Sequence, residues 1–200
     1  MARIAGSTKQ ESDDRIMNSA LFCLANYGDK ATTFQSIASR AGVSPASVVN
    51  YFKTREQIYP RVLDYVITAA RRDTVEATQK PQDPAKRLSA YFKVSVEFFR
   101  SAPERAKIYL LMYHFASFSP TYTRICTEIK EVAIDRIDSI LKDGEENGVF
   151  KLEEDRRLVA RFIHNSLNGL LISLLTNTQP TSDSTLLKNF EKEIFKIIKR

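Results

Sequence analysis

The residues whose types and spacing suggest chemistry lie between positions 30 and 55. They offer hydroxyls, one amide and cations, a set suited to hydrogen bonding and charge pairing with a polyanion. Residues 33–52 read Thr-Phe-Gln-Ser-Ile-Ala-Ser-Arg-Ala-Gly-Val-Ser-Pro-Ala-Ser-Val-Val-Asn-Tyr-Phe. From Lys30 to Arg55 there are four basic residues and no carboxylate, whereas the flanking stretches are acid-rich. A surface that faces phosphates requires such a distribution.

Small and apolar residues in the same stretch predict two short helices joined by a tight turn. A helix-turn-helix packs its helices closely, so a small residue such as Ala38 is needed at the crossing. Gly42 tolerates the positive φ that the turn favours. The residues expected in the small core beneath are Ile37, Val43, Val48 and Phe52.

The third helix of this region, capped by Ser44 with Pro45 in its first position, is the expected DNA-reading element. The predicted phosphate contacts are Thr33, Ser44, Tyr51, Lys53 and Arg55. The predicted base-reading residues are Pro45, Ala46, Ser47, Val49 and Asn50. Only Asn50 has the bidentate amide suited to adenine. As alternatives, Asn50 could be a solvated helix residue and Tyr51 a core aromatic, and Arg40 is expected simply to solvate its helix.

The elements that position these residues are expected to be helices throughout. The 200 residues carry a net charge of +6 and few glycines or prolines, and no strand-like alternation lasts. We expect a first helix capped by Ser12 and ending at Gly28, a second capped by Thr32 or Thr33, and a fourth opened by a capping box from Thr54 to Gln57. Pro60 is expected to bend that fourth helix. Further helices are predicted over 84–100, 103–115, 120–146, 154–177 and 182–199, giving an all-α fold of about nine helices.

Other features bound the class of protein. Cys23 and Cys126 are expected to be reduced thiols within helices. The N-terminus lacks an apolar region and the longest apolar run, Gly169–Leu175, is too short to span a bilayer, so we expect a cytoplasmic protein without a membrane segment. There are two histidines and no HExxH, GxSxG, P-loop or GxGxxG motif. We therefore expect no catalysis, no cofactor and no metal.

In combination, the N-terminal residues resemble the tetracycline-repressor (TetR) family of transcriptional regulators. The residues that carry the resemblance are Ile16, Ser19-Ala20, Gly28, Thr32-Thr33, Ile37-Ala38, Ala41-Gly42-Val43-Ser44, Tyr51-Phe52 and Arg55-Glu56. They cover residues 15–63, about a quarter of the chain. Three positions depart from the family pattern: Ala46 replaces Gly, Val49 replaces a phosphate-contacting Tyr, and Arg55 replaces Lys. Val49 could instead touch a thymine methyl group.

The resemblance implies a regulator, expected to be a repressor, that binds a palindromic operator as a homodimer and is released by a small-molecule effector. Residues 1–55, with a core at 12–53, would form the helix-turn-helix DNA-binding domain. Residues 56–200 would form a helical domain for effector binding and dimerisation. A different class remains open, because Ala46 and Val49 are also compatible with a helical small-molecule-binding or scaffold protein whose DNA binding is weak or lost.

Two sets of residues in the C-terminal region are candidates for these roles. The predicted dimer interface consists of Leu158, Phe162, Leu170, Leu174, Leu186, Phe190, Ile194 and Ile197. The alternative is that both apolar stripes are buried within one chain. The predicted pocket, for an apolar or aromatic effector, consists of Phe92, Tyr109, Met112, Tyr113, His114, Phe118, Tyr122, His164 and Asn168. Ordinary core packing is the alternative there.

Overall fold

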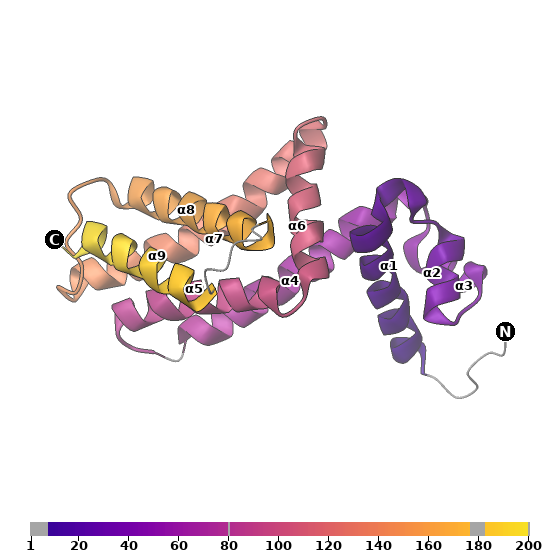
Figure 1. The fold of residues 1–200 in the computed structure, drawn as a ribbon, viewed down its shortest axis with the longest axis horizontal. Coiled ribbons are helices and arrows are strands. Elements are labelled where there is room, and N and C mark those ends of the chain that lie inside the picture. Colours follow the sequence, from indigo (N-terminus) through magenta and orange to yellow (C-terminus); the bar gives the residue numbers. More distant parts are fainter. Residues whose placement is uncertain (1–7, 80, 177–182, 200) are drawn as a thin grey trace. The chain divides into compact units, whose positions relative to one another are not determined.

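A computed structural model describes residues 8–79, 81–176 and 183–199. Within these ranges the chain forms nine α-helices and one short 3-10 turn, and its extended pairing is limited to an isolated bridge between Lys151 and Lys199. The predicted all-α fold is confirmed (Figure 1). The elements are α1 Lys9–Ala31, α2 Phe34–Ala41, α3 Pro45–Phe52, η1 Arg55–Gln57, α4 Ile58–Gln79, α5 Pro84–Arg100, α6 Pro103–Ala116, α7 Pro120–Glu146, α8 Arg156–Thr176 and α9 Asp183–Ile198.

The helices fall into two compact units. The first unit comprises residues 1–68 and 102–114, and the second comprises residues 69–101 and 115–200. These are units of packing, whereas the predicted division at residues 55 and 56 concerns function. That functional division stays a prediction.

In the first unit, α1 begins earlier than the sequence suggested. Thr8, not Ser12, caps it: the Thr8 hydroxyl accepts from the Glu11 N–H at 3.2 Å and the Glu11 carboxylate accepts from the Thr8 N–H at 2.9 Å. This reciprocal capping box satisfies two helix-end donors, which Ser12 with Arg15 three residues later cannot do. Gly28, at φ 76°, interrupts the helical backbone as expected, although a further turn continues to Ala31.

The turn between α2 and α3 has the predicted geometry. Thr33 caps α2, and Gly42 ends it in the left-handed conformation at φ 66°. The Val43 N–H donates to the Ala38 carbonyl at 3.1 Å, the 6→1 bond of a Schellman motif. Ser44 caps α3 and Pro45 occupies its first turn, as predicted.

The start of α4 differs from the prediction. Thr54 makes no side-chain cap, and residues 55–57 form the 3-10 turn η1 before α4 begins at Ile58. The predicted capping box is therefore wrong. Because α4 starts three residues later than expected, Pro60 lies in its first turn, where the missing N–H has no helical partner to lose. The expected bend at Pro60 is not required.

In the second unit, α5, α7, α8 and α9 pack together around an apolar core. Leu88 and Phe92 of α5 and Ile137 of α7 are fully buried, and Phe92 meets Phe190 of α9 edge to face, with ring centroids 5.0 Å apart. Asp83 caps α5 by accepting from the N–H groups of Ala85 and Lys86. The predicted bounds of α5 and α7 are confirmed.

Ion pairs reinforce the packing of α7 against α8. Arg156 pairs with Asp138 at 3.0 Å, and Arg157 pairs with Glu131 at 2.6 Å. By length and composition alone, Arg156–Leu175 is the one helix among the described residues that could cross a membrane. Length and composition are weak evidence for a membrane span, and Arg156 and Arg157 at the start of this helix pair with carboxylates of α7.

Candidate nucleic-acid interface

Helix α3 has one buried and one exposed face. Val48 and Phe52 are fully buried, while Pro45, Ala46 and Asn50 are exposed and Val49 is 40% exposed. The exposed residues recur at helical spacing, so they form one continuous surface. Ile37 and Ala38 of α2 close the core beneath, which confirms the predicted core except that Val43 is only half-buried.

The hydroxyls at the start of α3 are engaged in capping. The Ser44 hydroxyl accepts from the Ser47 N–H at 3.2 Å and lies 2.9 Å from the Ser47 hydroxyl. Ser47 is also half-buried. Of the predicted base-reading residues, Ser47 therefore has its hydroxyl turned to the cap, and Asn50 supplies the exposed amide.

Lys53, which follows α3, has an uncommon backbone conformation. Its φ is 68° and its ψ is −58°, and it is the one non-glycine residue with positive φ in the described chain. The Thr54 N–H donates to the Phe52 carbonyl at 2.9 Å, closing a γ-turn around Lys53. This turn places an exposed lysine directly after α3, and nothing in the local sequence signals it, since lysine is not a usual residue for positive φ.

Arg55, predicted as a phosphate contact, is held by the end of α1. Its guanidinium donates to the Asp29 carbonyl at 2.6 Å and lies 3.3 Å from the Asp29 carboxylate. A guanidinium has five donors, so a phosphate contact would have to share this group with Asp29. Arg55 consequently has a structural role that the sequence did not indicate.

Aromatic rings hold two other arginines near the site. The Arg61 guanidinium lies 4.3 Å from the Tyr51 ring centroid and donates to the Tyr51 carbonyl. Burial raises the pKa of the Tyr51 phenol, and the charge of Arg61 partly offsets this. Arg40, which was expected only to solvate α2, instead lies 3.2 Å from the Phe22 ring centroid. Both contacts are cation–π interactions that fix the surface around α3.

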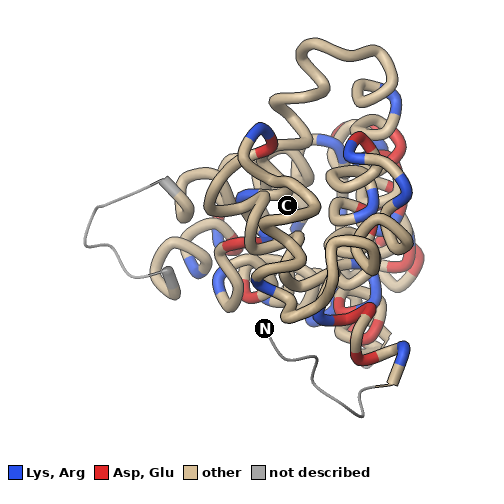
Figure 2. Tube along the Cα trace, turned by 90° about the vertical axis from the view of Figure 1, so that its right-hand side faces the viewer, with Lys and Arg blue, Asp and Glu red and all other residues tan. Residues whose placement is uncertain are grey.

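Charge over the rest of the chain is mixed. Lys and Arg positions are spread among Asp and Glu positions along the trace (Figure 2). The helix-turn-helix stretch differs because it contains cations without carboxylates, so the net charge of +6 is not itself the signal.

The predicted dimer residues differ in their exposure. Leu158 and Phe162 of α8 are 60% and 51% exposed, Ile197 of α9 is also exposed, and Leu170, Leu174, Leu186 and Phe190 are half-buried. Ile194 is only 3% exposed, so its side chain packs within the protomer. Ile194 is therefore corrected from interface to core, and the interface role of the other residues stays a prediction.

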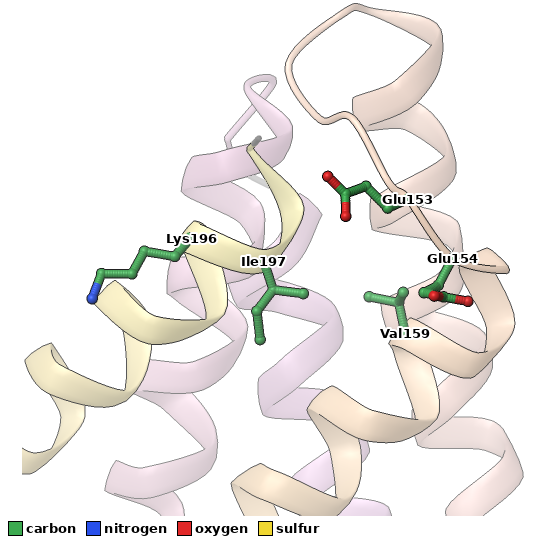
Figure 3. Close-up of a pocket in the computed structure, with 5 residues that line it drawn as sticks. All are labelled: Glu153, Glu154, Val159, Lys196 and Ile197. Carbon is green, nitrogen blue, oxygen red and sulfur yellow. The ribbon is translucent and has the colours of Figure 1, made fainter.

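A cavity of about 260 Å³ lies between the start of α8 and the end of α9. Figure 3 shows Val159 and Ile197 facing each other across it, with Glu153 above them and Lys196 pointing away. Lys196 pairs instead with Glu193 at 2.7 Å. The apolar surface of α8 and α9 thus continues into this cavity.

The predicted effector residues belong to both units. Tyr109, Met112, Tyr113 and His114 are in the first unit, and Phe92, Phe118, Tyr122, His164 and Asn168 are in the second. Within the first, the hydroxyls of Tyr109 and Tyr113 lie 3.1 Å apart, while Met112 is fully buried. Within the second, Phe118 is 76% exposed and borders an open cavity of about 630 Å³ at the turn between α6 and α7. That these residues line a single effector pocket stays a prediction.

His164 is a buried neutral group. It is 5% exposed, and its Nε2 lies 2.8 Å from the Asn168 amide nitrogen. Because an amide nitrogen only donates, Nε2 accepts this bond. Burial lowers the pKa of His164 from 6.5 to about 4, with a further contribution from Lys130.

Comparisons with known proteins agree with this geometry. Residues 16–62 match the family model described as "Bacterial regulatory proteins, tetR family". The HTH-type transcriptional regulator BetI of Rhizobium meliloti is 32% identical over 110 residues, 55% of this chain and 54% of that protein. The HTH-type transcriptional repressor KstR2 of Mycolicibacterium smegmatis is 29% identical over 157 residues, 76% of this chain and 74% of that protein. The chain thus spans about half the length of the BetI relatives that it matches.

Solved structures show the same fold. A putative transcriptional regulator from Saccharomonospora viridis, in complex with choline, has a TM-score of 0.84 at 19% identity and covers 96% of this chain and 100% of that one. The ketosteroid regulator KstR2 of Mycobacterium tuberculosis has a TM-score of 0.71 at 21% identity and covers 99% and 100%. At such identities the likeness shows the fold alone.

The fold and the exposed α3 surface together define a helix-turn-helix protein. The predicted resemblance is confirmed by the match of residues 16–62 to the model of the tetR family of bacterial regulatory proteins.

Proposed function

We propose that this protein is a DNA-binding transcriptional repressor that binds a palindromic operator as a homodimer and releases it on binding a small molecule. The observation that carries the proposal is the division of α3, in which Val48 and Phe52 are fully buried while Ala46, Val49 and Asn50 are exposed. A short helix with an exposed outer face, presented by a small packed core, is the form of a recognition helix. The relatives named as transcriptional regulators support the same assignment.

Backbone groups and cations would provide the phosphate contacts. The N-termini of α2 and α3 offer N–H groups beside Thr33 and Ser44, which suit anions. Lys53 adds an exposed charge at the other end of α3. Such contacts hold a recognition helix in register but carry no sequence information.

Dimerisation supplies the remaining affinity. A single module buries too little surface for tight specific binding, so two are needed, about 34–36 Å or a multiple of it apart. We propose that Leu158, Phe162 and Ile197, with the half-buried leucines of α8 and α9, form an isologous interface. Ion pairs of Arg157 with Glu131 and Asp135 hold α8 against α7.

The effector is proposed to be an apolar or aromatic small molecule bound in the helical domain. The regulator from Saccharomonospora viridis was solved with choline, which supports ligand binding by this fold. Effector binding would act by favouring a conformation whose two α3 helices are wrongly spaced for the operator. The same proposal implies a cytoplasmic protein without catalytic activity.

The test is selection of bound fragments from random duplex DNA by the full chain. We expect a palindromic consensus to emerge, and repetition with candidate small molecules should release it. If no fragment is enriched at low salt, while a small molecule still binds, the alternative of a ligand-binding or scaffold protein is correct.

A further inference from the structure

The exposed surface of α3 is mainly apolar. Pro45, Ala46 and Val49 are exposed on it, and Asn50 is the exposed amide among them. One exposed valine on a protein surface is ordinary. Here the apolar groups adjoin one another in rows, because Pro45 and Val49 are four residues apart, as are Ala46 and Asn50.

Few polar side chains on this surface are available to read bases. The Ser47 hydroxyl lies 2.9 Å from that of Ser44, within the cap, and is half-buried. Arg55 is bound to Asp29, and Arg61 stacks on Tyr51. Lys53 lies beyond the last turn of α3, where it suits a phosphate better than a base.

The major groove offers one apolar group that such a surface can contact, the C5 methyl of thymine, and adenine is the base whose N6 and N7 fit an asparagine amide. Given the proposed function, we infer that Val49 reads a thymine methyl group in each operator half-site, beside an A·T pair read by Asn50. The half-site is therefore A·T-rich where α3 enters the groove, and Val49 determines specificity at one position.

Val49 is suited to contact a thymine methyl group and not a phosphate. A valine side chain has no hydrogen-bond donor, so it cannot bond to a phosphate oxygen. It adds binding free energy only where it shields an apolar group, such as a methyl, from water. Loss of one buried methyl corresponds to about fourfold in Kd. Contact of this kind depends on the methyl group and not on the hydrogen-bonding pattern of the base pair.

Deoxyuridine provides the test, because it differs from thymidine only by that methyl group. Each thymine of the selected half-site is replaced in turn by deoxyuridine, and Kd is measured for the full chain and for Val49→Ala. We expect one replacement to weaken the wild type about fourfold and to leave Val49→Ala unaffected. Val132→Ala, which truncates an exposed valine of α7, should respond like the wild type.

The outcomes distinguish this inference from the proposed function. If the wild type binds its operator and no deoxyuridine replacement weakens it, the inference is wrong and the function stands. If a replacement weakens the wild type and Val49→Ala equally, another residue reads the methyl group and the assignment to Val49 is wrong. If neither protein binds any duplex, the proposed function itself is wrong.

Discussion

Arg55 and Asp29 join the turn after α3 to the end of α1. The guanidinium donates to the Asp29 carbonyl at 2.6 Å and approaches its carboxylate to 3.3 Å. Both side chains are about 40% exposed, so solvent screens the ionic part of this contact. The hydrogen bond to the carbonyl is the larger contribution, because it is short and solvent screening weakens it less than the ionic contact.

Removing the guanidinium should affect stability first. We expect Arg55→Ala to lower the free energy of unfolding by about 1 kcal/mol and Asp29→Asn, which retains the carbonyl, by less. Urea unfolding followed by circular dichroism measures both. Equal losses in the two variants would show that the carboxylate, not the carbonyl, is the important partner.

Lys53 permits a test of charge and backbone strain together. A lysine at φ 68° is strained and a glycine is not, so Lys53→Gly should be about 1 kcal/mol more stable than Lys53→Ala. Both variants lack the cation, and each should reduce the slope of log Kd against log salt by about 1. An unchanged slope in both would remove Lys53 from the phosphate contacts.

Asn50 is predicted to determine one base pair. Asn50→Ala should relax the preference for adenine at one position of each half-site, by about 1–3 kcal/mol of discrimination. Repeating the selection with the variant measures this, with Asn18→Ala of α1, also exposed, as the matched control. A consensus identical to that of the wild type would make Asn50 a solvated residue.

His164 makes stability depend on pH. Its pKa is about 4 in the folded protein and 6.5 in the unfolded chain, so the unfolded state takes up the proton first as pH falls. The stabilisation is present above pH 6.5 and is lost as pH falls toward 4, by at most about 3 kcal/mol. His164→Gln should flatten this part of the profile. Parallel profiles for the wild type and His164→Gln would contradict the assignment.

The exposed side of α8 is predicted to hold the dimer together. Phe162→Glu should shift the protein toward monomer by at least tenfold in dimer Kd, because it places a charge in a buried apolar contact. Sedimentation equilibrium measures this. Phe118→Glu, at a more exposed phenylalanine in the turn between α6 and α7, should leave the mass unchanged. A dimer unaffected by Phe162→Glu would place the interface elsewhere.

Local sequence signals predicted the helix-turn-helix closely. Gly42 and Ser44 act within a few residues of themselves, and their geometry follows from backbone preferences alone. Apolar periodicity likewise predicted the bounds of α5 and α7. Where two residues could each cap a helix, the one that forms the complete capping box does so. Thr8 therefore caps α1 in place of Ser12.

Local sequence signals could not predict the long-range contacts. The pairing of Arg55 with Asp29 joins residues 26 positions apart, and the γ-turn at Lys53 contradicts the local preference of lysine. Ile194 and Ile197 belong to the same apolar stripe, yet only one is buried, because packing against the rest of the unit decides which face of α9 is covered. Periodicity alone cannot separate a core face from an interface.

The central claim is that a dimer presents two copies of α3, which together read duplex DNA. Its most direct test is a titration of the selected palindrome and of a single half-site with the full chain, from 50 to 200 mM salt. The account predicts two protomers on the palindrome, much weaker binding to the half-site, and a steep loss of affinity with salt. A strictly monomeric protein with no affinity for either duplex at the lowest salt would contradict it.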